Sequence, residues 1–364
     1  MDETGERRIM KRRDTDNIRI ESTDSVTPPA KLHLKYPHSD YTSNVVYGAR
    51  EEAQKILTGE SDRLLVIVGP CSIHDPDAAL VYADKLLALR EELGDQLHII
   101  MRVYFEKPRT SIGWKGLIND PDLQGNFDIN KGLGVARKLL LDLSKKGMPA
   151  ATEYLDLITP QYIADLVAWG AIGARTTESQ GHRELASGVS CPIGFKNATN
   201  GNVDVAINAI ESASHRHRFL SVKKEGHTAI FQTKGNADCH VILRGGSDGA
   251  NYDVESVANA VNALKDKKLY PHLMVDFSHA NSGSQHKNQL KVSSDVAGQI
   301  ASGSIAICGV MIESHLNEGK QDATDIPKAE LVYGQSITDA CIGWDDTEVV
   351  LHELAAAVEQ RRKK

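Results

Sequence analysis

The sequence predicts a (β/α)8 barrel of the TIM type, because it contains eight apolar runs of β-type composition with helical patterns between most of them. Strands that are packed on both faces have this continuous apolar character. The active sites of such barrels lie at the carboxyl ends of the strands, so the residue that closes each run is informative. The runs are LLVIVGPC to Cys71, HIIMR to Arg102, PAATE to Glu153, AIGAR to Arg175, PIGFK to Lys196, HVILR to Arg244, LMVDFSH to His279 and IAICGVMIE to Glu313.

The chain divides into an extension and one large domain. Residues 1–45 are polar and are expected to lie outside the barrel in a regulatory or inter-subunit role, although their composition also fits a flexible tail. Residues 46–364 are assigned to the catalytic barrel, a length that one TIM domain with additions can fill. Asp75 and Pro76 predict the start of the first crossover helix, and Gly94 predicts its end.

A second β-rich pair interrupts the alternation between the fifth and sixth runs. The segments FLSV at 219–222 and TAIFQT at 228–233 are separated by a short polar turn, in an interval too long for one helix. This pattern predicts an inserted β-hairpin at about residues 215–235.

Composition narrows the class of protein. The formal net charge of -7 disfavours nucleic acid as a partner, because such binding normally shows a basic stripe. Five cysteines, an odd number, favour a reducing compartment over a disulfide framework. No apolar run is long enough to span a membrane, and the charged amino terminus lacks a signal-peptide core. We therefore expect a cytoplasmic enzyme.

Cationic side chains gather at or just beyond the predicted strand ends. Arginine grips carboxylate or phosphate oxygens through two parallel N–H bonds, and lysine adds a compact charge. Any one of these residues would fit a solvated surface. Together they would repel one another without an anion, so they predict a polyanionic substrate. The set is Arg102, Lys107, Arg109, Arg175, Lys196 and Arg244.

A second set has the chemistry of metal ligands. One thiolate, one imidazole and two carboxylates suit Mn, Fe, Co or Zn better than Mg or Ca, and such an ion would polarise a carbonyl oxygen. His74 competes for a place in this set, and Cys71 alone would more often be a core residue. Asp276 is expected to orient His279. The candidate ligands are Cys71, His279, Glu313 and Asp339.

Seven long motifs resemble the 3-deoxy-D-arabino-heptulosonate 7-phosphate (DAHP) synthases, in the feedback-regulated class shared by enteric bacteria and fungi. The resemblance covers about residues 45–360, and motifs of this length are very specific. It implies a metal-dependent barrel that condenses phosphoenolpyruvate with erythrose 4-phosphate in the first step of the shikimate pathway. The motifs are GPCSIHD, MRVYFEKPRTSIGWKGLINDP, ARTTESQ, GFKNATNG, DFSHANSGSQHKNQ, GVMIESHLNEGKQ and YGQSITDACIGW.

The resemblance assigns roles to individual residues. It implies that the four candidate ligands hold the metal and that His74 does not. The phosphate of phosphoenolpyruvate would be held by Ala174, Arg175, Lys196 and Arg244, and its carboxylate by Arg102 and Lys107. The phosphate of the aldose would be held by Arg109 and Thr110.

Charge placement then suggests which residues take part in the chemistry. Glu153 and Lys196 are expected to position the water that attacks the enol carbon, although Glu153 could instead pair with an arginine. Lys107 is expected to protonate the new alkoxide. Two other readings stay open at this stage: a synthase that uses arabinose 5-phosphate, and a silent barrel that senses an amino acid or scaffolds an assembly.

The resemblance also implies feedback inhibition and an oligomer. We expect a homodimer or a higher oligomer in which the extension reaches a neighbouring subunit. We expect phenylalanine, rather than tyrosine, to inhibit, because a serine at 221 fills the space that a tyrosine hydroxyl would need; Ser221 would otherwise be an ordinary outward strand residue. The residues matched to the inhibitor pocket are Gln161, Gly188, Ser190, Phe219 and Ser221.

Overall fold

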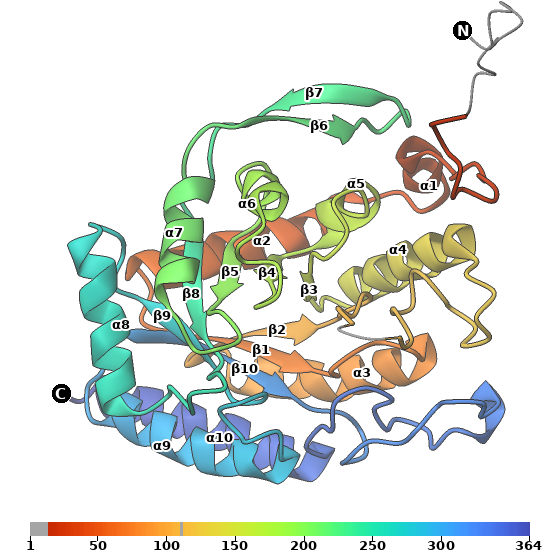
Figure 1. Cartoon of the computed structure of the whole chain (residues 1–364). Coiled ribbons are helices and arrows are strands. Elements are labelled where there is room, and N and C mark those ends of the chain that lie inside the picture. The colour runs from red at the N-terminus through yellow and green to blue at the C-terminus, as the bar shows by residue number, and fades with distance from the viewer. Residues whose placement is uncertain (1–13, 110–111) are drawn as a thin grey trace, which may run out of the picture.

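Eight parallel strands close into a barrel, in the order β1-β10-β9-β8-β5-β4-β3-β2 (Figure 1). The computed structural model describes residues 14–109 and 112–364. Every predicted run overlaps one strand of the barrel, and the predicted (β/α)8 barrel is confirmed. The strands are β1 Leu64–Gly69, β2 Leu97–Arg102, β3 Ala150–Glu153, β4 Trp169–Ile172, β5 Ile193–Lys196, β8 Cys239–Leu243, β9 Leu273–Asp276 and β10 Ile307–Glu313.

Helices surround the barrel and connect consecutive strands. Helix α3 begins where the sequence predicts, because the Asp75 side chain accepts hydrogen bonds from the backbone N–H groups of Asp77 and Ala78, and Pro76 fits the first turn. The α-helices are α1 Pro29–Lys35, α2 Asp40–Thr58, α3 Pro76–Glu92, α4 Ile129–Lys145, α5 Pro160–Ile163, α6 Gln180–Ala186, α7 Asp204–Ala213, α8 Val254–Asp266, α9 Gln289–Ala301 and α10 Trp344–Arg361. Three short 3₁₀ helices are η1 Ala164–Leu166, η2 His286–Asn288 and η3 Lys328–Glu330.

The strands bury both of their faces, which explains their continuous apolar composition. In β1, Leu65 belongs to the cluster inside the barrel, whereas Val66 belongs to the cluster between strands and helices. Trp169 and Ile242 fill the interior so completely that a Cβ on Gly194 would lie 2.6 Å and 2.5 Å from their side-chain atoms. The interior is therefore a packed core and leaves no room for a ligand inside the barrel.

Helix α2 closes the amino-terminal end of the barrel. Its Ala49, Ala53 and Ile56 are buried in the same cluster as the barrel interior. His98 at the start of β2 bonds to the Ala49 carbonyl through Nε2 at 3.0 Å. Arg50 donates to the Val167 carbonyl just before β4 at 3.0 Å. These contacts leave the carboxyl-terminal end as the open one.

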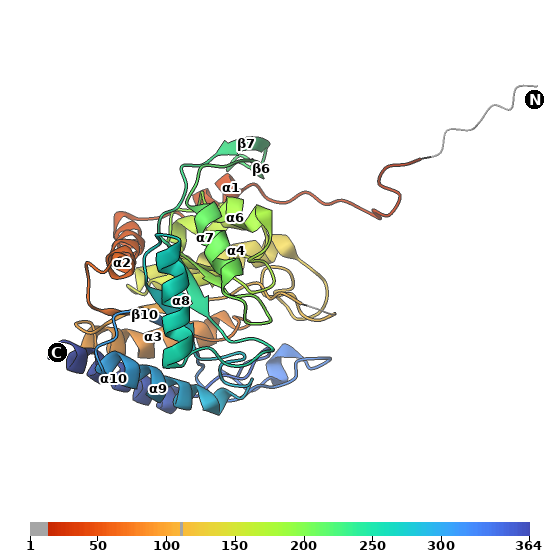
Figure 2. The same ribbon diagram turned by 60° about the vertical axis from the view of Figure 1, so that its left-hand side comes forward.

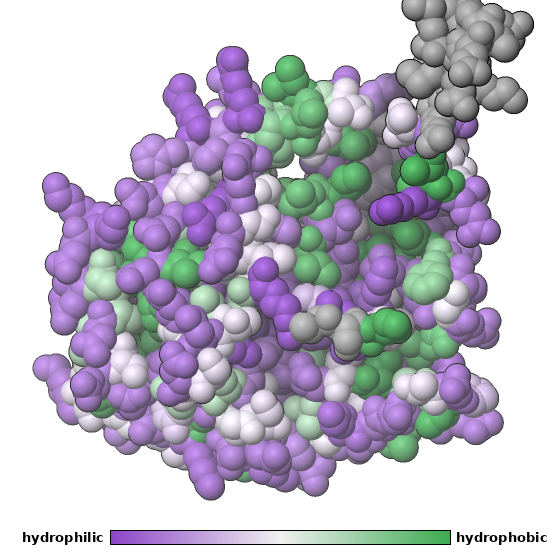
Figure 3. All heavy atoms as spheres, in the orientation of Figure 1, coloured by the Kyte–Doolittle hydropathy of each residue, from purple (hydrophilic) through white to green (hydrophobic). Residues whose placement is uncertain are grey.

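The predicted hairpin is present as β6 Arg218–Val222 and β7 Thr228–Gln232, a two-stranded antiparallel sheet apart from the barrel (Figure 1). Its outward side chains Leu220 and Ile230 are each 73% exposed and face each other across the strands. Figure 3 shows hydrophobic side chains gathered on and below the hairpin, on a face that is otherwise mostly hydrophilic.

The amino-terminal segment contacts the hairpin and then leaves the body of the protein. The Ala30 N–H donates to the Lys224 carbonyl at 2.7 Å, and the described residues before α1 run outward (Figure 2). The first 13 residues of the predicted extension lie outside the described part. Helix α2 runs through the predicted boundary at residue 45, so the division into extension and barrel stays a prediction. No helix among the described residues has both the length and the apolar character that crossing a membrane requires.

Replacing Ile242 by alanine should destabilise the fold. The side chain is fully buried inside the barrel, so the change should lower the free energy of unfolding by about 2–5 kcal/mol. The matched control is Ile305→Ala, because Ile305 is 71% exposed and should cost no more than about 0.5 kcal/mol. Urea titration of both variants measures the difference, and equal losses would contradict the packed interior.

Candidate active site

One cavity of about 340 Å³ lies at the carboxyl-terminal end of the barrel. Loops that follow six of the eight strands, together with the last residue of β3, contribute to its wall, so residues far apart in sequence meet there. Of the predicted site residues, the wall contains Lys107, Arg109, Glu153, Ala174, Arg175, Lys196, Arg244, His279 and Asp339. Thr110 lies outside the described residues. The convergence of strand-end side chains on one mouth is therefore observed, while the roles of the individual residues stay predictions.

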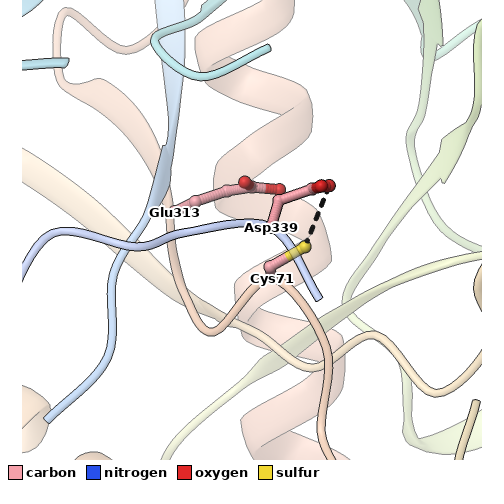
Figure 4. A group of neighbouring side chains, drawn as sticks. All are labelled: Cys71, Glu313 and Asp339. Carbon is pink, nitrogen blue, oxygen red and sulfur yellow. Dashed lines mark hydrogen bonds between the residues drawn. The ribbon is translucent and has the colours of Figure 1, made fainter. Parts of the chain in front are cut away.

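Three carboxylate and thiol groups come close enough to share a metal ion. One ligand atom each from Cys71, Glu313 and Asp339 lies within 4.8 Å of the other two (Figure 4). The Cys71 thiol is 3.4 Å from an Asp339 oxygen. One sulfur and two carboxylate donors fit a borderline divalent transition metal and would be an unusual choice for Ca²⁺ or Mg²⁺. His74 is not part of this group.

His279, the fourth predicted ligand, lies beside the group. Its Nε2 is 3.9 Å from Glu313 Oε1, and its Nδ1 is 3.0 Å from Asp276 Oδ2. Its φ of 57° is a left-handed conformation, which a non-glycine residue adopts only where its surroundings impose it. Asp276 thus contacts His279 as the sequence predicts, and the imidazole is held between two carboxylates.

Asp276 also holds Lys196. The Lys196 ammonium is 2.9 Å from Asp276 Oδ2, and both side chains are buried. Burial raises the pKa of Asp276, but the neighbouring His279 and Lys196 outweigh this and hold the pKa well below its ordinary value. The carboxylate therefore stays ionised and anchors two residues that line the cavity.

Lys107 contacts the thiol of Cys71. Its ammonium nitrogen is 3.1 Å from the Cys71 sulfur. Burial raises the pKa of Cys71 to about 11, with Glu313 adding to the rise and Lys107 opposing it. The cluster therefore joins one ammonium to three groups that can each carry negative charge, of which Lys107 and Asp339 line the cavity and Cys71 and Glu313 are fully buried beside it.

Arg102 occupies a different place from the other cations. It is fully buried and does not line the cavity. Its guanidinium donates to Glu313 Oε1 at 2.9 Å and to the carbonyls of Pro70 and Cys71, each at 3.1 Å. Its centre also lies 3.6 Å from the centroid of the Tyr104 ring. The predicted binding of a substrate carboxylate stays a prediction, and the structure adds a contact with a candidate metal ligand.

Glu153 lines the cavity and has one buried oxygen without a hydrogen-bond partner. Its side chain is buried, and Oε1 makes no hydrogen bond to any described residue. A Cβ on Gly173 would lie only 2.4 Å from that oxygen, so the glycine leaves space for it. Oε1 has no arginine partner among the described residues, and the role of Glu153 in positioning a water stays a prediction.

The sequence analysis missed several residues of the cavity wall. Lys320 and His286 add basic groups at the mouth, and Ser278 and Ser284 add hydroxyls. Lys320 comes seven residues after β10 and His286 ten after β9, so neither stands at a strand end. Their only signal was membership of long motifs that also contain ligand residues.

A second cavity of about 780 Å³ lies beneath the hairpin. The alternation of β6 turns Phe219 and Ser221 toward it and Leu220 outward. Asp165 adds an acidic group to its wall, where Arg137 donates to both carboxylate oxygens at 2.8 and 2.9 Å. All five residues predicted to surround an inhibitor line this cavity, namely Gln161, Gly188, Ser190, Phe219 and Ser221.

Comparisons with known proteins agree with this geometry. The model of a family described as the DAHP synthetase I family matches residues 44–352. The chain belongs to the DAHP synthetase I family. A phospho-2-dehydro-3-deoxyheptonate aldolase of Haemophilus influenzae is 59% identical over 348 residues, which are 96% of each chain. The Phe-sensitive enzyme of that name from Escherichia coli K12 is 58% identical over 95% of this chain and 98% of its own.

A solved structure extends the likeness to three dimensions. The phospho-2-dehydro-3-deoxyheptonate aldolase of Francisella tularensis superposes with a TM-score of 0.92 at 52% identity, covering 94% of this chain and 99% of that one. The family resemblance predicted from the motifs is thereby confirmed. Neither the arabinose 5-phosphate reading nor the silent-barrel reading receives support from these relatives.

Glu106, next to Lys107, should make stability depend on pH. Burial raises its pKa from 4.5 to about 7, with nearby Asp156 adding to the rise and a hydrogen bond from Thr159 opposing it. A raised native pKa gives stability that is fully present below pH 4.5 and is lost as the pH rises through about 7. Relative to Glu106→Gln, the free energy of unfolding of the wild type should fall by roughly 3 kcal/mol across that pH range. Urea titrations at several pH values give the free energy of unfolding of both proteins. Values that change with pH in the same way in the wild type and in Glu106→Gln would contradict this prediction.

Proposed function

We propose that this protein condenses phosphoenolpyruvate with D-erythrose 4-phosphate to DAHP and inorganic phosphate, with a divalent transition metal such as Mn, Fe, Co or Zn. Family membership makes the chain a 3-deoxy-7-phosphoheptulonate synthase of the shikimate pathway. The observation that carries the metal-dependent form is the convergence of Cys71, Glu313 and Asp339 beside the cation-lined cavity.

The cations of the cavity suit two phosphorylated substrates. Arg175, Lys196 and Arg244, with the backbone of Ala174, would hold the phosphate of phosphoenolpyruvate. The exposed Arg109 at the mouth, with Thr110, would hold the aldose phosphate. Arg102 and Lys107 are assigned to the carboxylate of phosphoenolpyruvate. Lys107 lines the cavity, which supports its assignment, whereas the fully buried Arg102 does not line it.

Three side chains have positions that suit proton transfer. When bound, the divalent ion would supply Lewis-acid polarisation of the aldehyde carbonyl. The methylene carbon of phosphoenolpyruvate forms a bond to that carbonyl carbon, and Lys107 donates a proton to the resulting alkoxide. Glu153 orients a water and accepts its proton as the oxygen adds to the enol carbon, with Lys196 alongside. The bond between this carbon and the oxygen that bridges to phosphorus then breaks, which releases inorganic phosphate and leaves the ketone of DAHP.

Removing a predicted metal ligand should abolish activity without unfolding the barrel. Cys71→Ser, His279→Ala and Glu313→Ala should each lose bound metal, because strand-end residues serve chemistry while stability resides mainly in the barrel layers. Glu313→Ala should also lower the free energy of unfolding, because it leaves the buried Arg102 without its anionic partner. Metal content by elemental analysis and thermal unfolding separate the two effects. Full activity of any of these variants after treatment with a chelator would refute the metal assignment.

The two anion sites should respond separately to mutation. Arg244→Ala or Lys196→Ala should raise the KM for phosphoenolpyruvate, and Arg109→Ala should raise the KM for the aldose phosphate. Each loss corresponds to about 2–4 kcal/mol if a charged hydrogen-bonded pair is removed. Steady-state kinetics with each substrate varied in turn test this, and equal effects of all three changes on both substrates would argue against separate sites.

We further propose that an aromatic amino acid inhibits the enzyme by binding beneath the hairpin. The Phe-sensitive name of the Escherichia coli relative and the positions of all five predicted residues around the second cavity support this. The inward side chains Phe219 and Phe231, with ring centroids 6.1 Å apart, offer an apolar wall for an aromatic ring. A homodimer or higher oligomer, in which the extension reaches a neighbour, is part of the same proposal.

Phenylalanine should inhibit more strongly than tyrosine, and Ser221→Gly should narrow or reverse that preference. The serine side chain lies in the cavity wall, and its loss leaves room for a tyrosine hydroxyl. Titrating the activity of both proteins with each amino acid gives the inhibition constants. Stronger inhibition of the wild type by tyrosine, or an unchanged preference in the variant, would overturn the assignment of Ser221.

A further inference from the structure

Glu313 is the most enclosed member of the candidate metal group. Its side chain is fully buried, and its backbone is held on both sides by the side chain of Gln289, which is also fully buried. Gln289 donates to the Glu313 carbonyl at 2.9 Å and accepts from the Glu313 N–H at 3.0 Å. These two hydrogen bonds fix the backbone at the end of β10.

Each oxygen of the Glu313 carboxylate accepts a hydrogen bond from a different side chain. Arg102 donates to Oε1 at 2.9 Å, and the Ser278 hydroxyl donates to Oε2 at 2.8 Å. The last torsion of a glutamate side chain has a broad energy profile, so packing alone leaves the carboxylate plane loosely defined. Two donors on opposite oxygens fix that plane.

Ser278 lies between two candidate metal ligands, His279 and Glu313. It directly precedes His279, is only 6% exposed and lines the active-site cavity. Its backbone N–H donates to Asp276 Oδ1 at 2.9 Å, while the other oxygen of Asp276 contacts His279. A single buried serine thus connects the loop after β9, which carries His279, with the carboxylate at the end of β10.

We propose that Ser278 is a positioning residue of the metal centre, whose hydroxyl holds the Glu313 carboxylate in the orientation that faces Cys71 and Asp339. The inference rests on the proposed metal-dependent function. Hydrogen-bond partners that orient metal ligands are typically worth about 10–100-fold in metal affinity. Ser278 would therefore act on the affinity for the ion, without itself touching the ion or the substrates.

The test is the affinity of metal-stripped protein for Mn²⁺, measured by competition with a chromophoric chelator. Ser278→Ala should weaken binding by about 10–100-fold. Ser278→Thr keeps a hydroxyl and should bind Mn²⁺ much more tightly than the alanine variant. The activity of Ser278→Ala should rise toward that of the wild type as Mn²⁺ is added. Thermal unfolding of the stripped proteins checks that all variants fold.

Ser282→Ala is the matched control. Ser282 is a buried serine of the same loop and the same cavity wall, but its hydroxyl donates to the His279 carbonyl and not to Glu313. Its replacement should change Mn²⁺ affinity far less than Ser278→Ala does. Equal weakening by both changes would mean that the loop was merely loosened, and would overturn the proposal.

Two further outcomes separate the inference from the proposed function. If Ser278→Ala binds Mn²⁺ as tightly as the wild type while its KM for phosphoenolpyruvate rises, Ser278 is a substrate-binding residue and the positioning role is refuted. If the wild type itself does not bind a divalent transition metal, the metal-dependent function fails and the role of Ser278 fails with it.

Discussion

The buried ion pair between Arg102 and Glu313 ties together the part of the barrel on which the active site depends. Strand β1 lies between β2 and β10 in the sheet. Arg102 closes β2, Glu313 closes β10, and the same guanidinium donates to the carbonyls of Pro70 and Cys71 just beyond β1. Removing such charges from water is costly, and the cost is offset only where further hydrogen bonds complete the pair. Here Ser278 and the carbonyls complete it.

The buried and the exposed cations of the cavity wall differ in the partners that they contact. Each buried cation of the cavity wall has an anionic or ionisable partner, because Lys196 contacts Asp276 and Lys107 contacts the Cys71 thiol. Arg175 and Arg109, which are exposed at the mouth, contact only backbone carbonyls among their described hydrogen-bond partners. The mouth therefore presents positive charge that these two arginines do not share with acidic partners, which suits an anionic ligand.

The same fold separates catalysis from the second cavity. Helix α2 closes the opposite end of the barrel, so ligands can enter only at the carboxyl-terminal mouth or outside the barrel. The hairpin arches over α5 and α6, whose residues Gln161 and Leu185 line the cavity beneath it, outside the barrel. An insertion between β5 and β8 therefore adds a cavity without altering the packed interior, as loops on a rigid barrel commonly do.

The sequence by itself determined the barrel, its hairpin and most of the residues at its mouth. Continuous apolar runs specify strands buried on both faces, and the carboxyl ends of parallel strands must meet at one end of a closed barrel. Only the tertiary structure decided that Arg102 turns inward to Glu313, that Asp276 holds Lys196 in addition to His279, and that Ser278 and Lys320 join the cavity wall. Side chains of a strand alternate between faces, and loop residues have no fixed periodicity, so their directions depend on neighbours that are distant in sequence.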